Sequence, residues 1–179
     1  MIDADVIRPY RRTAVDFYET EQLKQHLQSV KQIRNPFYLD FNDFDRILRW
    51  KLRQRYGRQE SLRSKNTDEI IKKITSLALN ISHEDKDYEL ELRFKLLIAL
   101  RGVEVPVASA ILALCFPEQY AVIDFRGWRQ VFGVDRRYFT LNDYKRYLKE
   151  VKRLAAELGW SPQEVDLAIW EYDRQKSRR

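Results

Sequence analysis

The chain contains very little cysteine, histidine, glycine or proline, and each shortage excludes a class of protein. Cys115 is the only cysteine among 179 residues, so neither an intrachain disulfide nor a four-cysteine zinc or iron–sulfur site can form. The two histidines, His26 and His83, lie far apart in the sequence and make a poor metal pair. Five glycines and five prolines are too few for a turn-rich sandwich or barrel. We therefore expect no metal and no other cofactor.

Long apolar runs are missing as well. No run reaches the roughly 20 residues that a membrane-spanning helix needs, and the N-terminus lacks the basic-then-apolar pattern of a signal peptide. We therefore expect a cytoplasmic protein that is not bound to a membrane. In such a reducing compartment, Cys115 is expected to be a buried thiol, because it lies inside an apolar run.

Apolar, aromatic and charged residues are abundant. The chain is 44% hydrophobic and 34% charged, with 9 Phe, 10 Tyr and 4 Trp, which is enough to bury a real core. Residues 1–179 therefore fit a single compact domain, or two small helical lobes that share one core. The net charge of +6 favours a polyanionic partner such as nucleic acid. The oligomeric state is left open, and a monomer is assumed.

The hydrophobic periodicity predicts an all-α fold. Apolar residues recur at helical spacing in segments near residues 13–33, 42–55, 70–81, 88–100, 107–116, 127–132, 141–158 and 162–175. Predicted caps are Asp40 or Asn42, Asn66 or Thr67, and Ser161 followed by Pro162, while Gly159 ends a helix. The first dozen residues are expected to form a basic arm, residues 56–69 a polar connection, and residues 175–179 a frayed tail.

The most informative segment is residues 100–128, "LRGVEVPVASAILALCFPEQYAVIDFRGW". It predicts a helix, a turn that contains glycine, and a second helix of small apolar residues, with the pair spanning about residues 89–116. Such a turn exposes backbone N–H groups at the start of the second helix, where the helix dipole also favours an anion. A phosphate bound there positions a duplex without reading its sequence.

This segment resembles the core of the helix-hairpin-helix DNA glycosylase superfamily, which includes endonuclease III and the 8-oxoguanine glycosylases. The family pattern places a leucine and a proline before a glycine-x-glycine hairpin, then a helix of small residues, then valine-aspartate before a bulky helix start. The resemblance covers roughly thirty residues. It extends to Trp50, Lys51 and Asn66, which accompany a similar hairpin in bacterial proteins of unknown activity. It implies a glycosylase-like helical fold and base-excision repair of duplex DNA.

The chain also departs from the family pattern. Gly102 keeps the first hairpin glycine, but Glu104 replaces the second and brings a carboxylate close to the expected phosphate. The lysine with which some members form an imine falls at Pro106, which cannot do that chemistry. The aspartate is kept as Asp124. The resemblance therefore implies a small, divergent, monofunctional member that lacks the catalytic lysine and the iron–sulfur cluster.

Asp124 is the candidate catalytic residue. Cleavage of an N-glycosidic bond builds positive charge on the sugar, and a carboxylate in a dry cleft stabilises that charge and orients water. Its apolar neighbours Val122, Ile123 and Phe125 are expected to shield it. The plainer alternative is that Asp124 only caps the helix that follows. Arg126 is expected either to pair with Asp124 or to contact DNA.

Two sets of residues are candidates for binding DNA. The hairpin is expected to contribute the amides of Gly102, Val103 and Val105, with Arg101 beside them, although Gly102 could simply end a helix. The stretch 46–59, "RILRWKLRQRYGRQ", interleaves cations with aromatic residues, as nucleic-acid-binding segments do. Its candidate phosphate contacts are Lys51, Arg53, Arg55 and Arg58.

Two residues of this stretch carry further hypotheses. Trp50 is a candidate for stacking on a flipped base, and its alternative is a place in the core of an amphipathic helix. Lys51 is a candidate to supply, from another helix, the amine that Pro106 lacks. Trp128, Trp160 and Trp170 are expected to pack in the interior.

We expect a monofunctional DNA glycosylase that flips a damaged or mispaired base and uses Asp124 to help water cleave the bond. The first alternative is a non-catalytic DNA-binding module on the same scaffold, favoured by Glu104 and Pro106. The second is a helical interaction protein whose basic face meets an acidic partner. Fold similarity alone does not choose between them.

Overall fold

The computed structural model describes residues 2–177, apart from the side chain of Gln59, and the regular secondary structure of this part of the chain is all helical. The all-α prediction is therefore confirmed. The α-helices are α1 (Ala4–Ile7), α2 (Phe17–Ile33), α3 (Phe41–Leu52), α4 (Glu60–Arg63), α5 (Asp68–Asn80), α6 (Lys86–Ile98), α7 (Val105–Cys115), α8 (Phe125–Phe132), α9 (Leu141–Leu158) and α10 (Pro162–Lys176). Two 3₁₀ helices, η1 (Arg8–Tyr10) and η2 (Arg53–Gln59), follow α1 and α3.

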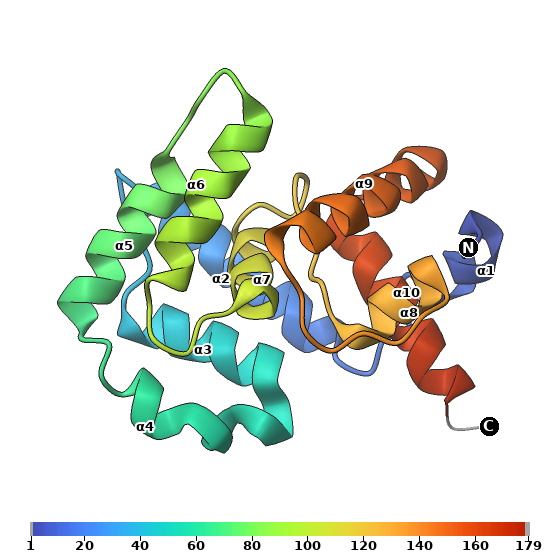
Figure 1. The fold of residues 1–179 in the computed structure, drawn as a ribbon, viewed down its shortest axis with the longest axis horizontal. Helices are drawn as coiled ribbons and strands as arrows, with labels where there is room; N and C mark the ends of the chain where they lie inside the picture. Colours follow the sequence, from blue (N-terminus) through green and yellow to red (C-terminus); the bar gives the residue numbers. More distant parts are fainter. Residues whose placement is uncertain (1, 178–179) are drawn as a thin grey trace.

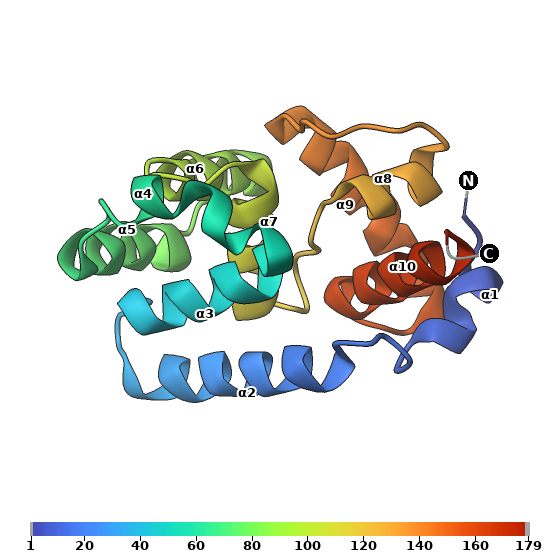
Figure 2. The ribbon, with the colours of Figure 1, turned by 90° about the horizontal axis from the view of Figure 1, so that it is seen from below.

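Helix α7 lies in the middle of the molecule (Figures 1 and 2). Helices α3, α5 and α6 lie on one side of it, and α8, α9 and α10 lie on the other. Helix α2 packs against α3 and α7 and runs along the length of the molecule (Figure 2). The position of α7 follows from its composition, because small and branched residues let neighbouring helices approach on every side. Every residue of α7 except Pro106 is buried.

Side chains predicted to cap helices do so. Asp40 and Ser161 each accept a hydrogen bond from the third residue of their helix and complete a capping box, at α3 and α10 respectively. Thr67 caps α5, and Gly159 ends α9 in the left-handed conformation with φ 66°. These local signals place the helix boundaries close to the predicted ones.

Two predictions of irregular structure are wrong. The expected basic arm instead forms α1 and η1, and Ile2, Ala4 and Ile7 are buried against the rest of the chain. Helix α1 and η1 both pack on α10, so apolar residues within the basic segment decide its place. The expected polar connection near residues 56–69 contains most of η2 and all of α4. In the expected tail, α10 continues to Lys176, and residues 178 and 179 lie outside the described residues.

Several predictions about single residues hold. Cys115 is a buried free thiol, and burial raises its pKa far above the usual range. Trp128 lies in the core with 2% of its surface exposed. Trp160 and Trp170 are half-buried, and each lies under an arginine guanidinium. Within residues 2–177, no helix is both long enough and apolar enough to cross a membrane.

Candidate functional site

Asp124 is the residue that precedes α8. Its backbone is extended, and its Oδ1 accepts a hydrogen bond of 2.8 Å from the amide of Gly127, so it caps the helix. The side chain is half-buried. No second partner for the carboxylate is found among residues 2–177, which leaves Oδ2 available to another group. Asp124 can therefore fill both predicted roles at once, because Oδ1 caps α8 while Oδ2 stays available.

Lys51 and Asp166 are the charged neighbours of Asp124. Lys51, near the end of α3, donates from Nζ to the carbonyl oxygen of Ile123 at 3.2 Å. Burial lowers the pKa of Lys51, and the carboxyl groups of Asp124 and Asp166 act in the opposite direction. Burial also raises the pKa of Asp166 well above its usual range. An amine and two carboxyl groups thus lie around residues 122–124, which Lys51 reaches from α3 and Asp166 from α10.

Two tyrosines of α9 lie against the same segment. Tyr144 donates its hydroxyl to the carbonyl oxygen of Ala121 at 3.1 Å. Tyr147 is fully buried, and its hydroxyl has no partner among the described residues. Burial raises the pKa of Tyr147 well above its usual range, and the nearby Asp166 and Asp124 raise it further. Burial likewise raises the pKa of Tyr144, so both hydroxyls stay protonated.

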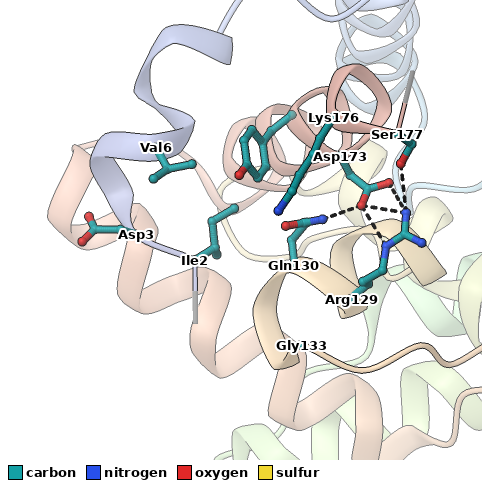
Figure 3. A pocket seen from close by; sticks show the side chains of 10 residues that line it. Ile2, Asp3, Val6, Arg129, Gln130, Gly133, Asp173, Lys176 and Ser177 are labelled. Atoms are coloured by element: carbon teal, nitrogen blue, oxygen red, sulfur yellow. Dashed lines mark hydrogen bonds and ion pairs between the residues drawn. The ribbon is translucent and has the colours of Figure 1, made fainter. Parts of the chain in front are cut away.

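Arg126 does not pair with Asp124, which is one of the two partners expected for it. Its guanidinium donates to Asp173 of α10 at 2.7 Å, not to Asp124. Arg129 and Gln130 also donate to Asp173, whose side chain is almost fully buried (Figure 3). A buried carboxylate needs cations and hydrogen-bond donors around it, which accounts for the pairing of Asp173 with Arg126. The contact between Arg126 and DNA stays a prediction.

The turn between α6 and α7 is where sequence patterns predict a phosphate site. Gly102 has φ 77°, a conformation that residues with a side chain rarely adopt. The amide of Val103 donates to the carbonyl oxygen of Leu100 at 3.1 Å, so the prediction that Val103 offers a free amide is wrong. For the amides of Gly102 and Val105, no partner is found among residues 2–177. The turn therefore offers fewer free amides than expected.

The surroundings of this turn carry both signs of charge. Arg101 is exposed, and its backbone is held on both sides by the side chain of Asn66. Glu104 precedes α7, is exposed, and makes no side-chain capping bond. Val105 and Pro106 are the first two residues of α7. The exposed carboxylate of Glu104 thus weakens the positive field that the helix start and Arg101 create.

The basic stretch 46–59 is divided between the core and the surface. Trp50 is buried and donates from Nε1 to the hydroxyl of Thr20 at 2.9 Å, which favours the packing role over the base pocket. Arg53 pairs with Asp16 and lies 4.7 Å from the ring centroid of Trp170. Its φ of 50° is strained for a residue with a side chain.

The remaining arginines of this stretch are accessible. The side chains of Arg55 and Arg58 are exposed, and no carboxylate among the described residues pairs with them. They could contact phosphates without first breaking an ion pair. Lys51, by contrast, is turned toward Ile123 and Asp124, so it lies among the residues around Asp124 and not with the exposed arginines.

Two surface depressions lie elsewhere in the described part of the chain. One, of about 520 Å³, is lined by α8, the end of α10 and the N-terminal segment (Figure 3). The other, of about 750 Å³, lies between the start of α6 and α9, and its lining includes four lysines, an arginine and two carboxylates. Neither is lined by Asp124 or Lys51. Between residues 2 and 177, no three His, Cys, Asp or Glu side chains are grouped closely enough to hold a metal ion.

Sequence patterns did not identify Asp166 or Tyr147 as part of this site. Asp166 lies between Val165 and Leu167 on α10, so a polar residue inside an apolar helix run was the available signal.

The comparisons with known proteins add no name to the site. No family model, curated protein or solved structure matches this chain significantly.

Proposed function

We propose that this chain is a helix-hairpin-helix DNA glycosylase-like enzyme that binds duplex DNA and hydrolyses the N-glycosidic bond of a damaged or mispaired base. The observation that carries the proposal is Asp124. One oxygen is held by Gly127 as a helix cap, and the other has no partner among the described residues. A carboxylate that is both anchored and available is what this hydrolysis needs.

The chemistry follows from where charge develops. As the base leaves, the sugar becomes positively charged, and a carboxylate nearby lowers the energy of that state. Two unit charges about 4 Å apart attract by about 1 kcal/mol in water and about 4 kcal/mol at an effective dielectric near 20. The apolar side chains of Val122 and Ile123 are buried beside Asp124 and favour the less polar setting. Asp124 would also orient the attacking water.

Binding of the duplex would use contacts that do not read sequence. The amide of Gly102 lies in the turn before α7 and that of Val105 at the first residue of α7, and Arg101 is exposed beside the turn. Arg55 and Arg58 supply further unpaired cations from η2. Each phosphate that is neutralised makes the slope of log affinity against log salt more negative by about 0.9. A charge-driven complex therefore weakens steeply as salt is added.

The test uses duplexes that carry oxidised, alkylated, deaminated or mismatched bases. After incubation and heating in alkali, strand breaks mark the sites from which a base was removed. Asp124→Asn is the matched control, because asparagine keeps an oxygen to cap α8 but has no charge. Breaks from the wild type and none from Asp124→Asn would support the proposal. Equal breaks from both proteins would remove Asp124 from the chemistry.

Lys51 has a second, separable test. A monofunctional enzyme forms no imine with an abasic sugar, so borohydride should trap no covalent complex on abasic duplex DNA. Burial lowers the pKa of Lys51, which favours the neutral amine that imine formation needs. A complex that forms with the wild type and is lost in Lys51→Ala would make Lys51 a nucleophile and the enzyme bifunctional.

A non-catalytic DNA-binding module is the second candidate function. It is favoured by the packing of Trp50 against Thr20, which leaves that ring bonded inside the core. The amide of Val103 and the carboxylate of Glu104 also weaken the expected phosphate site. Salt-dependent duplex binding by both the wild type and Asp124→Asn, with no breaks on any lesion, would favour this module.

A further inference from the structure

Residues 121–124 form the last part of the connection from α7 to α8, and they neither form a helix nor pair with a strand. Residues 121–123 are buried, so their backbone groups cannot rely on solvent for hydrogen bonds. Side chains from four helices supply the partners instead: Lys51 of α3, Ser109 of α7, Tyr144 of α9 and Asp166 of α10.

These four contacts are distributed along the segment. Tyr144 donates to the carbonyl oxygen of residue 121 at 3.1 Å, and the amide of residue 122 donates to Asp166 Oδ2 at 2.6 Å. The amide of residue 123 donates to Ser109 Oγ at 3.1 Å, and the carbonyl oxygen of residue 123 accepts from Lys51 at 3.2 Å. Hydrogen bonds with four side chains therefore hold the backbone that leads into Asp124.

We propose that Asp166 is a positioning residue for Asp124, acting with Ser109, Tyr144 and Lys51 to hold the backbone from which the Asp124 carboxylate projects. The proposal rests on the function proposed above, since it concerns how that carboxylate is kept in place. A carboxylate displaced by about 1 Å loses much of its effect on a developing charge. The side chains that fix the segment thus control the site without touching the sugar.

Asp166 is singled out because its contact is the shortest of the four and because it is buried, with 6% of its surface exposed. Burial raises its pKa well above the usual range, which favours a neutral hydrogen-bond acceptor over a second anion. Asparagine offers the same acceptor oxygen to the amide of Val122, whereas alanine offers none. The two substitutions therefore separate the hydrogen bond from the acidic group.

The experiment measures binding to two duplexes that differ at one sugar. One carries a pyrrolidine, which is cationic and imitates the charged sugar, and the other carries a neutral tetrahydrofuran. The ratio of the two dissociation constants measures how strongly the site prefers a positively charged sugar. It does not require the natural lesion to be known. For the wild type we expect a preference of at least about tenfold for the cationic duplex. Asp124→Asn should abolish the preference.

Asp166→Ala should reduce the preference toward unity while affinity for the neutral duplex stays within about twofold, because the phosphate contacts are unchanged. Asp166→Asn should retain the preference. Ser109→Ala removes a smaller group from the same segment and should lower the preference too, which keeps the test decisive if Asp166→Ala does not fold. Thr75→Ala is the matched control, because Thr75 holds the buried backbone of Leu39 in another part of the fold.

The outcomes separate this inference from the proposed function. A wild type without any preference for the cationic duplex would overturn both. A wild type with the preference, retained in Asp166→Ala and Ser109→Ala, would overturn the positioning role alone. Equal loss in Thr75→Ala would show that general loosening of the fold is responsible and would also overturn it.

Discussion

Asn66 holds the backbone of Arg101 with both ends of its side-chain amide. Its Nδ2 donates to the carbonyl oxygen of Arg101 at 2.9 Å, and its Oδ1 accepts from the amide of Arg101 at 2.9 Å. Asn66 itself is buried, with 5% of its surface exposed. The connection before α5 is thereby fastened to the turn between α6 and α7, although 35 residues separate the two.

Asn66→Ala should destabilise the protein by about 1–3 kcal/mol, because it leaves two backbone groups of Arg101 without partners. Chemical denaturation measures the change, and hydrogen exchange of the Arg101 amide should become much faster. The exposed Asn142→Ala is the control and should change stability by less than about 0.5 kcal/mol. Unchanged exchange at Arg101 would contradict the structural role of Asn66.

Asp124→Ala should destabilise the protein by about 1 kcal/mol, because α8 loses the acceptor for the amide of Gly127. Asp124→Asn should change stability by only a few tenths of that amount, since it keeps the acceptor. Urea denaturation of the two variants side by side separates the stability that comes from the cap from the stability that comes from the charge. Equal destabilisation by both would mean that the charge, and not the cap, holds the start of α8.

Gly127→Ala should disturb the same site through Tyr147. A Cβ at Gly127 would overlap the Tyr147 hydroxyl and lie 3.0 Å from its Cζ, so the ring must shift. We expect a loss of about 1–3 kcal/mol. Tyr147→Phe alone should be nearly neutral, because the hydroxyl it removes has no partner among the described residues.

The double variant Gly127→Ala with Tyr147→Phe should recover part of the loss, since the closest clashing atom is gone. Thermal denaturation of the four proteins in a double-mutant cycle gives the coupling between the two sites. Purely additive effects would contradict the contact between them.

Glu89 should contribute stability that disappears in acid. It accepts hydrogen bonds from Lys86, from the amide of His83 and from Arg93. Burial acts to raise the pKa of Glu89, but these donors outweigh it and lower the pKa to about 2. An unfolded glutamate has a pKa of about 4.3, so the stabilisation is complete above that pH and is lost as the pH falls toward 2.

Glu89→Gln should therefore flatten the decline in stability between about pH 5 and pH 2, by about 1–3 kcal/mol. Denaturation curves at several pH values measure the effect, and Glu118→Gln, at an exposed position, serves as the control. A decline as steep in Glu89→Gln as in the wild type would assign the acid sensitivity to other carboxylates.

Much of the fold follows from local features of the chain. Asp40, Thr67 and Ser161 cap helices where the sequence predicts them, because a cap depends on a few neighbouring residues. The composition of α7, apolar apart from Ser109, is likewise typical of a helix that others surround. The N-terminal segment was mispredicted because its few apolar residues, such as Ile2 and Ile7, matter only when a surface exists to receive them.

By itself, the sequence determined the longer helices, their caps, the glycine turn and the position of Asp124 before α8, because each depends on residues only a few positions apart. The tertiary structure alone decided which partners these residues have. Arg126 pairs with Asp173 rather than Asp124, and Lys51 and Asp166 reach the segment before Asp124 from positions 72 and 44 residues away along the chain. Such contacts depend on how helices pack, and no local pattern of residue types encodes that packing.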